Sequence, residues 1–106
     1  MARYIIQCNC VYNLWSTVVD APLLKPGLTK DQLIEELERR NETHDLDARL
    51  ARAEATGCSA INPRMTLAEV VSGNRAGPNK SELDLEAIIR EYLSLPEEVK
   101  PKSVWT

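Results

Sequence analysis

The feature that most constrains the fold is an alternating pattern near the start of the chain. Between Tyr4 and Leu14, apolar or weakly polar side chains alternate with polar ones. A period of two places the two sets on opposite faces of a β-strand. Because the stretch is long for one strand, we expect a bend or hairpin near Asn13, with Val18 and Val19 in its second half. The predicted buried face comprises Tyr4, Ile6, Cys8, Cys10, Tyr12 and Leu14.

Apolar residues that recur every three or four positions predict four short helices after this region. Thr29 with Gln32, and later Thr66 with Glu69, have the spacing of a capping box, in which two side chains satisfy free backbone N–H groups at a helix start. In the second helix, Arg49 is expected away from the apolar side. The helices are expected at about 30–41, 45–56, 67–72 and, beginning after Ser81 or Asp84, up to Leu95. The predicted fold class is α+β: an N-terminal β-strand or hairpin packed against about four short α-helices.

The length of the chain indicates one domain, because 106 residues leave little room for a second core. We assign residues 1–95 to a single compact α+β domain. Residues 96–106 contain two prolines and no hydrophobic period. We therefore expect a mobile C-terminal tail, which carries Trp105.

Charge and composition exclude several classes of function. The 13 Lys and Arg residues are outnumbered by 16 Asp and Glu residues, and the formal net charge is −3. No basic excess supports strong binding to nucleic acid, so we expect no nucleic-acid partner. No apolar run approaches the roughly 18 residues of a membrane span, and the first residues do not resemble a signal peptide. We expect a cytoplasmic protein without membrane contact.

Three cysteines and one histidine are the candidate metal ligands. Together they would match the four ligands of a tetrahedral zinc site. Cys8 and Cys10, however, are in phase with the strand pattern, where a free cysteine acts as a small apolar side chain. The paired C-x₂-C motifs of many zinc sites are missing. We therefore predict core packing, with no metal and no cofactor. The set considered is Cys8, Cys10, Cys58 and His44.

A catalytic function finds little support in the sequence. Histidine is the usual general base near neutral pH, and the chain contains one, His44. Asp45 or Asp47 could orient it. No serine or cysteine lies in a nucleophile motif, so the sequence shows no nucleophile that His44 would activate. We predict no catalytic residue and no enzymatic activity.

The loop from Gly73 to Lys80 is a candidate binding site. It contains two glycines together with Arg75, Asn79 and Lys80, and a predicted helix follows it. Glycines let the backbone approach a phosphate, and helix N-termini attract anions. The Walker pattern G-x-x-x-x-G-K-[ST] is absent, and no strand precedes the loop. A nucleotide- or phosphate-binding protein that uses this loop is one alternative hypothesis, beside a purely structural turn.

A second alternative is a small DNA-binding regulator of the helix-turn-helix type. Ala53-x-x-x-Gly57 followed by Ile61 is similar to the first helix and turn of that motif. The connector to the third predicted helix is, however, longer than the usual turn of about 3–4 residues. Arg64 is the one side chain of the recognition region that offers a base contact.

The remaining candidates are side chains that suit contact with another protein. Trp15 is out of phase with the alternating pattern; it either folds back into the core or contacts a partner, since tryptophan is enriched at binding hot spots. Asp20 is the one acid in an otherwise apolar stretch, where it either caps the strand end or has a functional role. An open strand edge could also pair with a second copy of the chain, giving a homodimer. The predicted partner-binding residues are Trp15, Asp20, Arg75, Asn79, Lys80 and Trp105.

Two short stretches, Trp15–Pro22 (WSTVVDAP) and Gly73–Asn79 (GNRAGPN), together with the chain length, resemble small accessory proteins of bacteriophages and prophages. The resemblance implies a protein that binds a host complex, such as a defence system, and changes its behaviour. It would place the chain in the host cytoplasm, and it supplies no catalytic residue. Our principal hypothesis is therefore a non-catalytic protein-binding accessory or inhibitor module.

Overall fold

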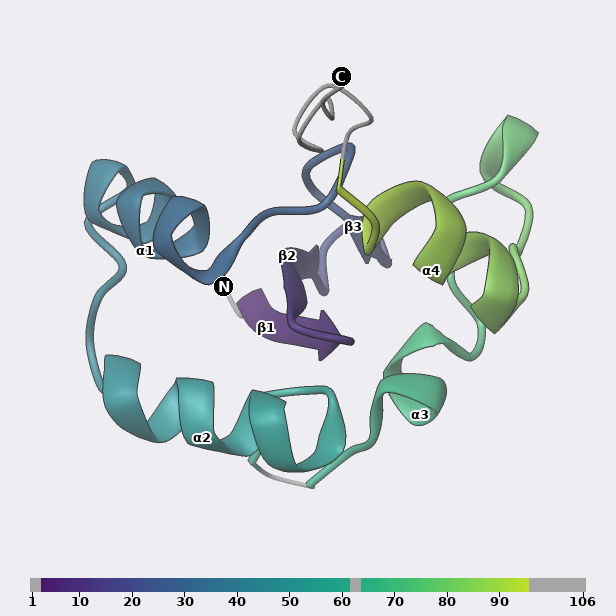
Figure 1. Cartoon of the computed structure of the whole chain (residues 1–106). Helices are drawn as coiled ribbons and strands as arrows, with labels where there is room; N and C mark the ends of the chain where they lie inside the picture. Colours follow the sequence, from purple (N-terminus) through teal and green to yellow (C-terminus); the bar gives the residue numbers. More distant parts are fainter. Residues whose placement is uncertain (1–2, 62–63, 96–106) are drawn as a thin grey trace, which may run out of the picture.

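The computed structural model describes residues 3–61 and 64–95, and these form an α+β fold, which confirms the predicted fold class. Figure 1 shows an antiparallel sheet of strand order β1-β2-β3 at the centre, with helices around it. The elements are β1 (Arg3–Cys8), β2 (Val11–Ser16), β3 (Ala21–Pro22), α1 (Lys30–Arg39), α2 (Leu46–Thr56), α3 (Leu67–Val71), the short 3₁₀-helix η1 (Pro78–Lys80) and α4 (Leu85–Tyr92). The tail predicted at 96–106, with Trp105, lies outside the described residues.

β1 and β2 form a hairpin whose turn contains two residues, Asn9 and Cys10. Both have left-handed backbone angles, with φ of 53° and 64°, as a two-residue turn that matches the twist of its strands requires. The prediction of a bend near Asn13 is wrong, because the chain reverses earlier. Across the turn Cys8 pairs with Val11, so the alternation changes phase at this point.

This change of phase decides where Trp15 lies. Residues that stand opposite one another in an antiparallel pair share a face of the sheet, and Trp15 lies opposite Tyr4. Its ring is therefore buried in one cluster with Ile6 and is 2% exposed. The prediction that Trp15 contacts a partner is wrong, because the hairpin turn places its side chain in the interior.

Helices cover both faces of the sheet, which gives the molecule two hydrophobic clusters. On one face the strands pack against α3 and α4, and on the other they pack against α1 and α2 (Figure 1). The first cluster contains Ile6, Trp15, Cys58, Ala60, Leu67, Val70, Val71, Ile88 and Leu93. The second contains Ile5, Tyr12, Leu14, Leu33, Leu37, Leu50 and Ala53.

Other segments of the chain occupy the two edges of the hairpin. Along β1, the Ser59 N–H donates to the Ile5 carbonyl at 2.9 Å. Along β2, Tyr12 and Leu28 exchange two backbone hydrogen bonds of 2.8 Å. A homodimer formed by strand pairing needs an unpaired edge, and these contacts give that alternative no support.

The helix start signals read from the sequence are confirmed at α1 and α3. The Thr29 hydroxyl accepts the Gln32 N–H, the Gln32 side chain accepts the Thr29 N–H, and Thr66 with Glu69 repeats the arrangement. Gly57 follows α2 with a left-handed φ of 91°, as expected for a glycine that ends a helix.

In the described part of the chain, no helix has the length and apolar character needed to cross a membrane.

Candidate functional site

The loop that joins β2 to β3 is held by Ser16, which is 6% exposed. Its Oγ accepts hydrogen bonds from the N–H groups of Val18 at 3.2 Å and Val19 at 3.4 Å. Its carbonyl accepts the Asp20 N–H at 2.9 Å. Asp20 completes the turn with a left-handed φ of 55°, a conformation that aspartate adopts more readily than most residues. The loop tip is therefore fixed by a side chain at the border of the core.

Val18 and Val19 are the unusual side chains of this loop. They are 69% and 52% exposed, and within residues 3–61 and 64–95 only Ile61 joins them as an exposed large apolar side chain. The expectation that they continue the strand is wrong, because Ser16 closes the chain into a turn at their backbone. Turns favour Gly, Asn, Asp, Ser and Pro over β-branched residues. Two adjacent exposed valines at a loop tip therefore indicate a contact surface.

The second loop of the site is built around the buried side chain of Asn74, which is 2% exposed. Its Nδ2 donates to the carbonyls of Val71 at 2.8 Å and Leu83 at 2.6 Å. Its Oδ1 accepts the N–H groups of Ala76 at 3.1 Å and Leu83 at 3.0 Å. These four hydrogen bonds join the end of α3 to the approach to α4. They fix the backbone from which the exposed Arg75 projects.

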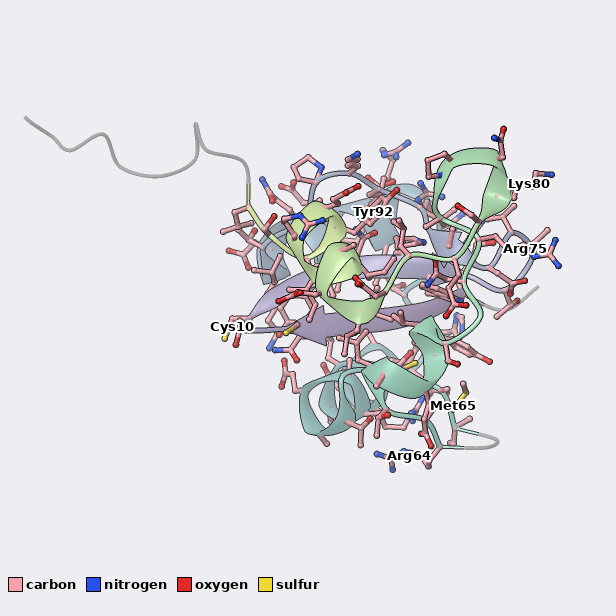
Figure 2. The ribbon with its side chains drawn as sticks, turned by 90° about the vertical axis from the view of Figure 1, so that its right-hand side faces the viewer. Cys10, Arg64, Met65, Arg75, Lys80 and Tyr92 are labelled. Atoms are coloured by element: carbon pink, nitrogen blue, oxygen red, sulfur yellow. The ribbon has the colours of Figure 1, made fainter. Side chains whose placement is uncertain are left out.

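The two loops meet around a cavity of about 220 Å³. A backbone hydrogen bond of 2.8 Å from the Arg75 N–H to the Asp20 carbonyl joins them. Figure 2 shows the side chains of Arg75 and Lys80 at the same end of the molecule, opposite Cys10 at the hairpin turn. We call the lining residues the valine–cation surface: Val18, Val19, Asp20, Ala21, Arg75 and Lys80.

The valine–cation surface carries two cationic side chains and one carboxylate. None of the ion pairs found between described residues involves Arg75, Lys80 or Asp20. The guanidinium of Arg75 therefore keeps its planar set of N–H donors for a ligand, and such a set fits a carboxylate in a bidentate manner. The site combines apolar contact area with donors for an acidic group.

Three of the partner-binding residues predicted from the sequence, Asp20, Arg75 and Lys80, come together on this surface. Asn79 is exposed next to Lys80 in η1, with a left-handed φ of 54°, but it does not line the cavity. The Asp20 carboxylate caps no strand end through a hydrogen bond to a described residue, and its backbone makes the link between the loops. Trp15 is in the core.

Sequence reasoning missed the role of Val18 and Val19 because β-branched residues were read as strand. A signal was present. Asp20 and Pro22 interrupt the apolar run within a few positions, and both residue types are typical of turns and strand ends.

The backbone of residues 73–77 gives no support to the phosphate-binding alternative for the Gly73–Lys80 loop. A phosphate cradle needs backbone N–H groups that point into it. The N–H groups of residues 73–77 all donate to acceptors within the protein. At the start of α4, the Asp84 carboxylate accepts the Ala87 N–H at 2.9 Å, which places a negative charge where an anion would bind.

α3 does not fit the helix-turn-helix alternative. A recognition helix needs exposed side chains that enter the major groove of DNA. α3 has five residues, and Leu67, Val70 and Val71 are buried in the first cluster. The connector that precedes it begins by pairing with β1. The proposed DNA-reading unit is therefore absent from this part of the fold.

The three cysteines occupy three different environments. Cys58 is buried, and burial raises the pKa of its thiol. Cys8 is partly buried against the first cluster, whereas Cys10 is exposed at the hairpin turn. The prediction of core packing, made for Cys8 and Cys10, is wrong for Cys10, because the turn position lies outside the sheet. Among the residues described, no group of three or more His, Cys, Asp or Glu side chains is placed to hold a metal ion.

Comparisons with protein-family models, curated proteins and solved structures gave no match for this chain. The function proposed below therefore rests on the two loops and on the residue types they display.

Proposed function

We propose that this chain is a non-catalytic protein-binding module that contacts its partner through the valine–cation surface. The observation that carries the proposal is the exposure of Val18 and Val19 beside Arg75 and Lys80. Covering apolar surface is favourable by roughly 25 cal/mol per Å². Cations beside such a patch attract a partner of opposite charge and fix its orientation.

The surface suits a partner that presents an apolar side chain bordered by carboxylates. The cavity of about 220 Å³ between the loops has room for one apolar side chain. Arg75 can donate two parallel hydrogen bonds to a carboxylate, and Lys80 supplies a compact positive charge. Asp20 repels acidic groups at its own position, so the carboxylates of the partner should lie toward the two cations.

An accessory or inhibitor role extends this proposal. The support for this role is the resemblance to small bacteriophage and prophage proteins. Two stretches carry that resemblance, and they supply most of the two loops that meet at the valine–cation surface: Trp15–Pro22 and Gly73–Asn79. A module of this kind acts by occupying a face of a larger complex, such as a host defence system. The partner is then a bacterial protein, met in the host cytoplasm.

Affinity capture from a bacterial lysate, followed by mass spectrometry, tests the proposal when four baits are compared. The baits are the wild type, the double variant V18S/V19S, the charge reversal R75E and the control I61S. Ile61 is 56% exposed, like the valines, but it does not line the surface. We expect the wild type and I61S to retain the same partner, and the other two baits to lose it by about tenfold or more.

Equal capture by all four baits, or no specific partner of the wild type, would refute the proposed surface. The four proteins should unfold at nearly the same temperature, because exposed substitutions of this kind change stability by about 0.5 kcal/mol or less. This measurement separates lost binding from lost folding.

A further inference from the structure

A second cavity, of about 400 Å³, lies between β1, α2 and the loops that flank α2. It shares no lining residue with the valine–cation surface. Three arginines and two carboxylates line it, so its walls carry a positive excess. We call the side chains that matter here the arginine pocket: Arg3, Glu42, His44, Asp45, Arg49 and Arg52.

Arg49 is the most unusual member of the arginine pocket. It is 6% exposed, so the expectation that it lies away from the buried side of α2 is wrong. Its Nη1 donates to the backbone carbonyls of Glu42 at 2.8 Å and His44 at 3.3 Å. A guanidinium has five N–H donors, and no described residue accepts a hydrogen bond from Nε or Nη2.

The carboxylates of Glu42 and Asp45 act on the charge of Arg49 without forming an ion pair with it. None of the ion pairs between described residues includes it. Burial lowers the pKa of Arg49, while the nearby charge of Glu42 acts in the opposite direction. An arginine stays charged at neutral pH even so. A buried charge is costly unless a counter-charge with good hydrogen-bond geometry approaches it.

Two further groups of the pocket lack part of their expected partners. Arg52 donates from Nε to the Ser59 carbonyl at 2.8 Å and belongs to no ion pair in the described part of the chain. Glu42 pairs with Arg3 through Oε2, whereas its Oε1 is buried without a described hydrogen-bond partner. The pocket therefore combines unused guanidinium donors with one unused carboxylate acceptor.

We propose that the arginine pocket binds a small oxyanion that also carries a hydroxyl group. The charged oxygens of the ligand accept N–H groups from Arg49 and Arg52, as phosphate and carboxylate groups do from guanidinium forks. Oε1 of Glu42 is closed off from the cavity in this structure, so the Glu42 side chain must turn to accept the ligand hydroxyl, which then relieves the cost of a buried unpaired acceptor. Hydrogen phosphate and 2-hydroxycarboxylates share this combination, whereas sulfate and acetate provide the anion alone.

A purely structural role for Arg49 is the competing interpretation. Its two hydrogen bonds to backbone carbonyls hold the loop before α2, and this would be sufficient reason for its burial. That role explains neither why Arg52 belongs to no ion pair between described residues nor why one oxygen of Glu42 is buried without a described hydrogen-bond partner. A ligand with both an anionic and a hydroxyl group accounts for all three.

Thermal unfolding of the full chain tests the proposal. The unfolding temperature is measured in phosphate, sulfate, glycolate and acetate, each at the same ionic strength as a sodium chloride reference. A ligand of the native state raises the unfolding temperature in a saturable way. We expect phosphate to stabilise more than sulfate, and glycolate more than acetate. A lower dissociation constant for phosphate identifies the ligand as a phosphate, and a lower one for glycolate identifies it as a 2-hydroxycarboxylate.

Three variants and one control place the ligand in the pocket. R49K and R52Q should weaken binding of the better of the two hydroxyl-bearing anions by about tenfold or more, the size expected for a lost charge-assisted hydrogen bond. E42Q should reduce the preference for phosphate over sulfate and for glycolate over acetate. R90Q is the control, because Arg90 lies on α4 with its side chain 66% exposed and does not line the pocket.

The proposal is overturned if no anion raises the unfolding temperature above the chloride reference, or if R52Q binds as tightly as the wild type. An unchanged preference in E42Q would remove the hydroxyl from the proposal. Should R49K fail to fold, R52Q decides, since the side chain of Arg52 makes only one described hydrogen bond, to the Ser59 carbonyl. None of these measurements uses the partner protein, so they stand apart from the proposed function.

Discussion

The arginine pocket and the valine–cation surface depart from the usual distribution of side chains in opposite ways. In the pocket, Arg49 is 6% exposed, whereas on the surface Val18 is 69% exposed. Folding alone favours neither arrangement, because burying a charge costs free energy and leaving apolar area exposed forgoes the gain of burying it. In the two proposals, a different ligand relieves each: an anion in the pocket and a protein face on the loops. A chain of ordinary composition thus shows its functional positions where residue type and burial disagree.

The two regions also differ in how they are held. The pocket is lined by β1, by α2 and by the loops that flank α2, and the second cluster fastens β1 to α2. The valine–cation surface stands on two loops, and each depends on one buried polar side chain, Ser16 in the first and Asn74 in the second. A change that loosens a loop should therefore affect partner binding and leave anion binding in place.

The largest effect is expected for N74A, which removes all four hydrogen bonds of the Asn74 side chain. Buried carbonyl and N–H groups then lose their partners, and the free energy of unfolding should fall by about 2–4 kcal/mol. Chemical denaturation measures this change. N79G is the matched control in the same loop, because Asn79 is exposed and glycine adopts its left-handed φ of 54°, so the stability should change by about 0.5 kcal/mol or less.

The same variant separates the two regions. N74A should lose the captured partner and keep the phosphate-dependent rise in unfolding temperature of the wild type. If partner capture survives in N74A at wild-type strength, the ordered loop is not what the partner contacts.

A smaller effect is expected at alkaline pH, in the second cluster, to which Tyr12 belongs. Burial, and then the hydrogen bond of 2.8 Å to Glu54, raises the pKa of Tyr12 to about 12 from an ordinary value of 10.0. The unfolded chain therefore loses this proton first as the pH rises. Below pH 10 the Tyr12 hydroxyl makes its full contribution to the free energy of unfolding. Between about pH 10 and pH 12 that free energy falls by roughly 2 kcal/mol as the contribution is lost.

Denaturation at a series of pH values from 8 to 12 checks this expectation, with Y12F as the control. Y12F should lack the part of the fall in the free energy of unfolding that comes from Tyr12. The part that comes from the titration of lysines should be the same in both proteins. Identical profiles for the two proteins would show that the hydroxyl does not join β2 to α2 as the structure has it.

Local signals predicted the helices well. Both capping boxes, Thr29 with Gln32 and Thr66 with Glu69, lie where their spacing placed them. The physical reason is that a cap is decided within one turn of helix by neighbouring residues. The α+β class followed from the same local patterns.

The hairpin and the pocket could not be predicted in the same way. The turn residues Asn9 and Cys10 lack the glycine that usually marks a two-residue turn, so the change of phase gave no signal and Trp15 was assigned to the wrong side. Arg49 belongs to the buried side of α2 by its spacing, but its residue type indicated solvent. Arg3 and Glu42 form their ion pair across 39 positions, a separation that no local pattern encodes.

The smallest effect is expected for C10G, which tests the hairpin that underlies both regions. Cys10 has a left-handed φ of 64°, and glycine adopts this conformation without the penalty of a Cβ atom. The free energy of unfolding should rise by about 0.5–1 kcal/mol, with partner capture and anion binding unchanged. A loss of stability would indicate that the chain does not turn at this residue.

The most direct test of the central claim, that this chain works by binding another protein through the valine–cation surface, is site-specific photo-crosslinking. A photo-reactive amino acid is placed at Val19 in one protein and, as a control, at the exposed Glu38 of α1 in another. Val19 should form a crosslink to one defined bacterial protein, and Glu38 should form none to it. A crosslink of equal yield from Glu38, or none from Val19 while the partner is still captured, would contradict the account.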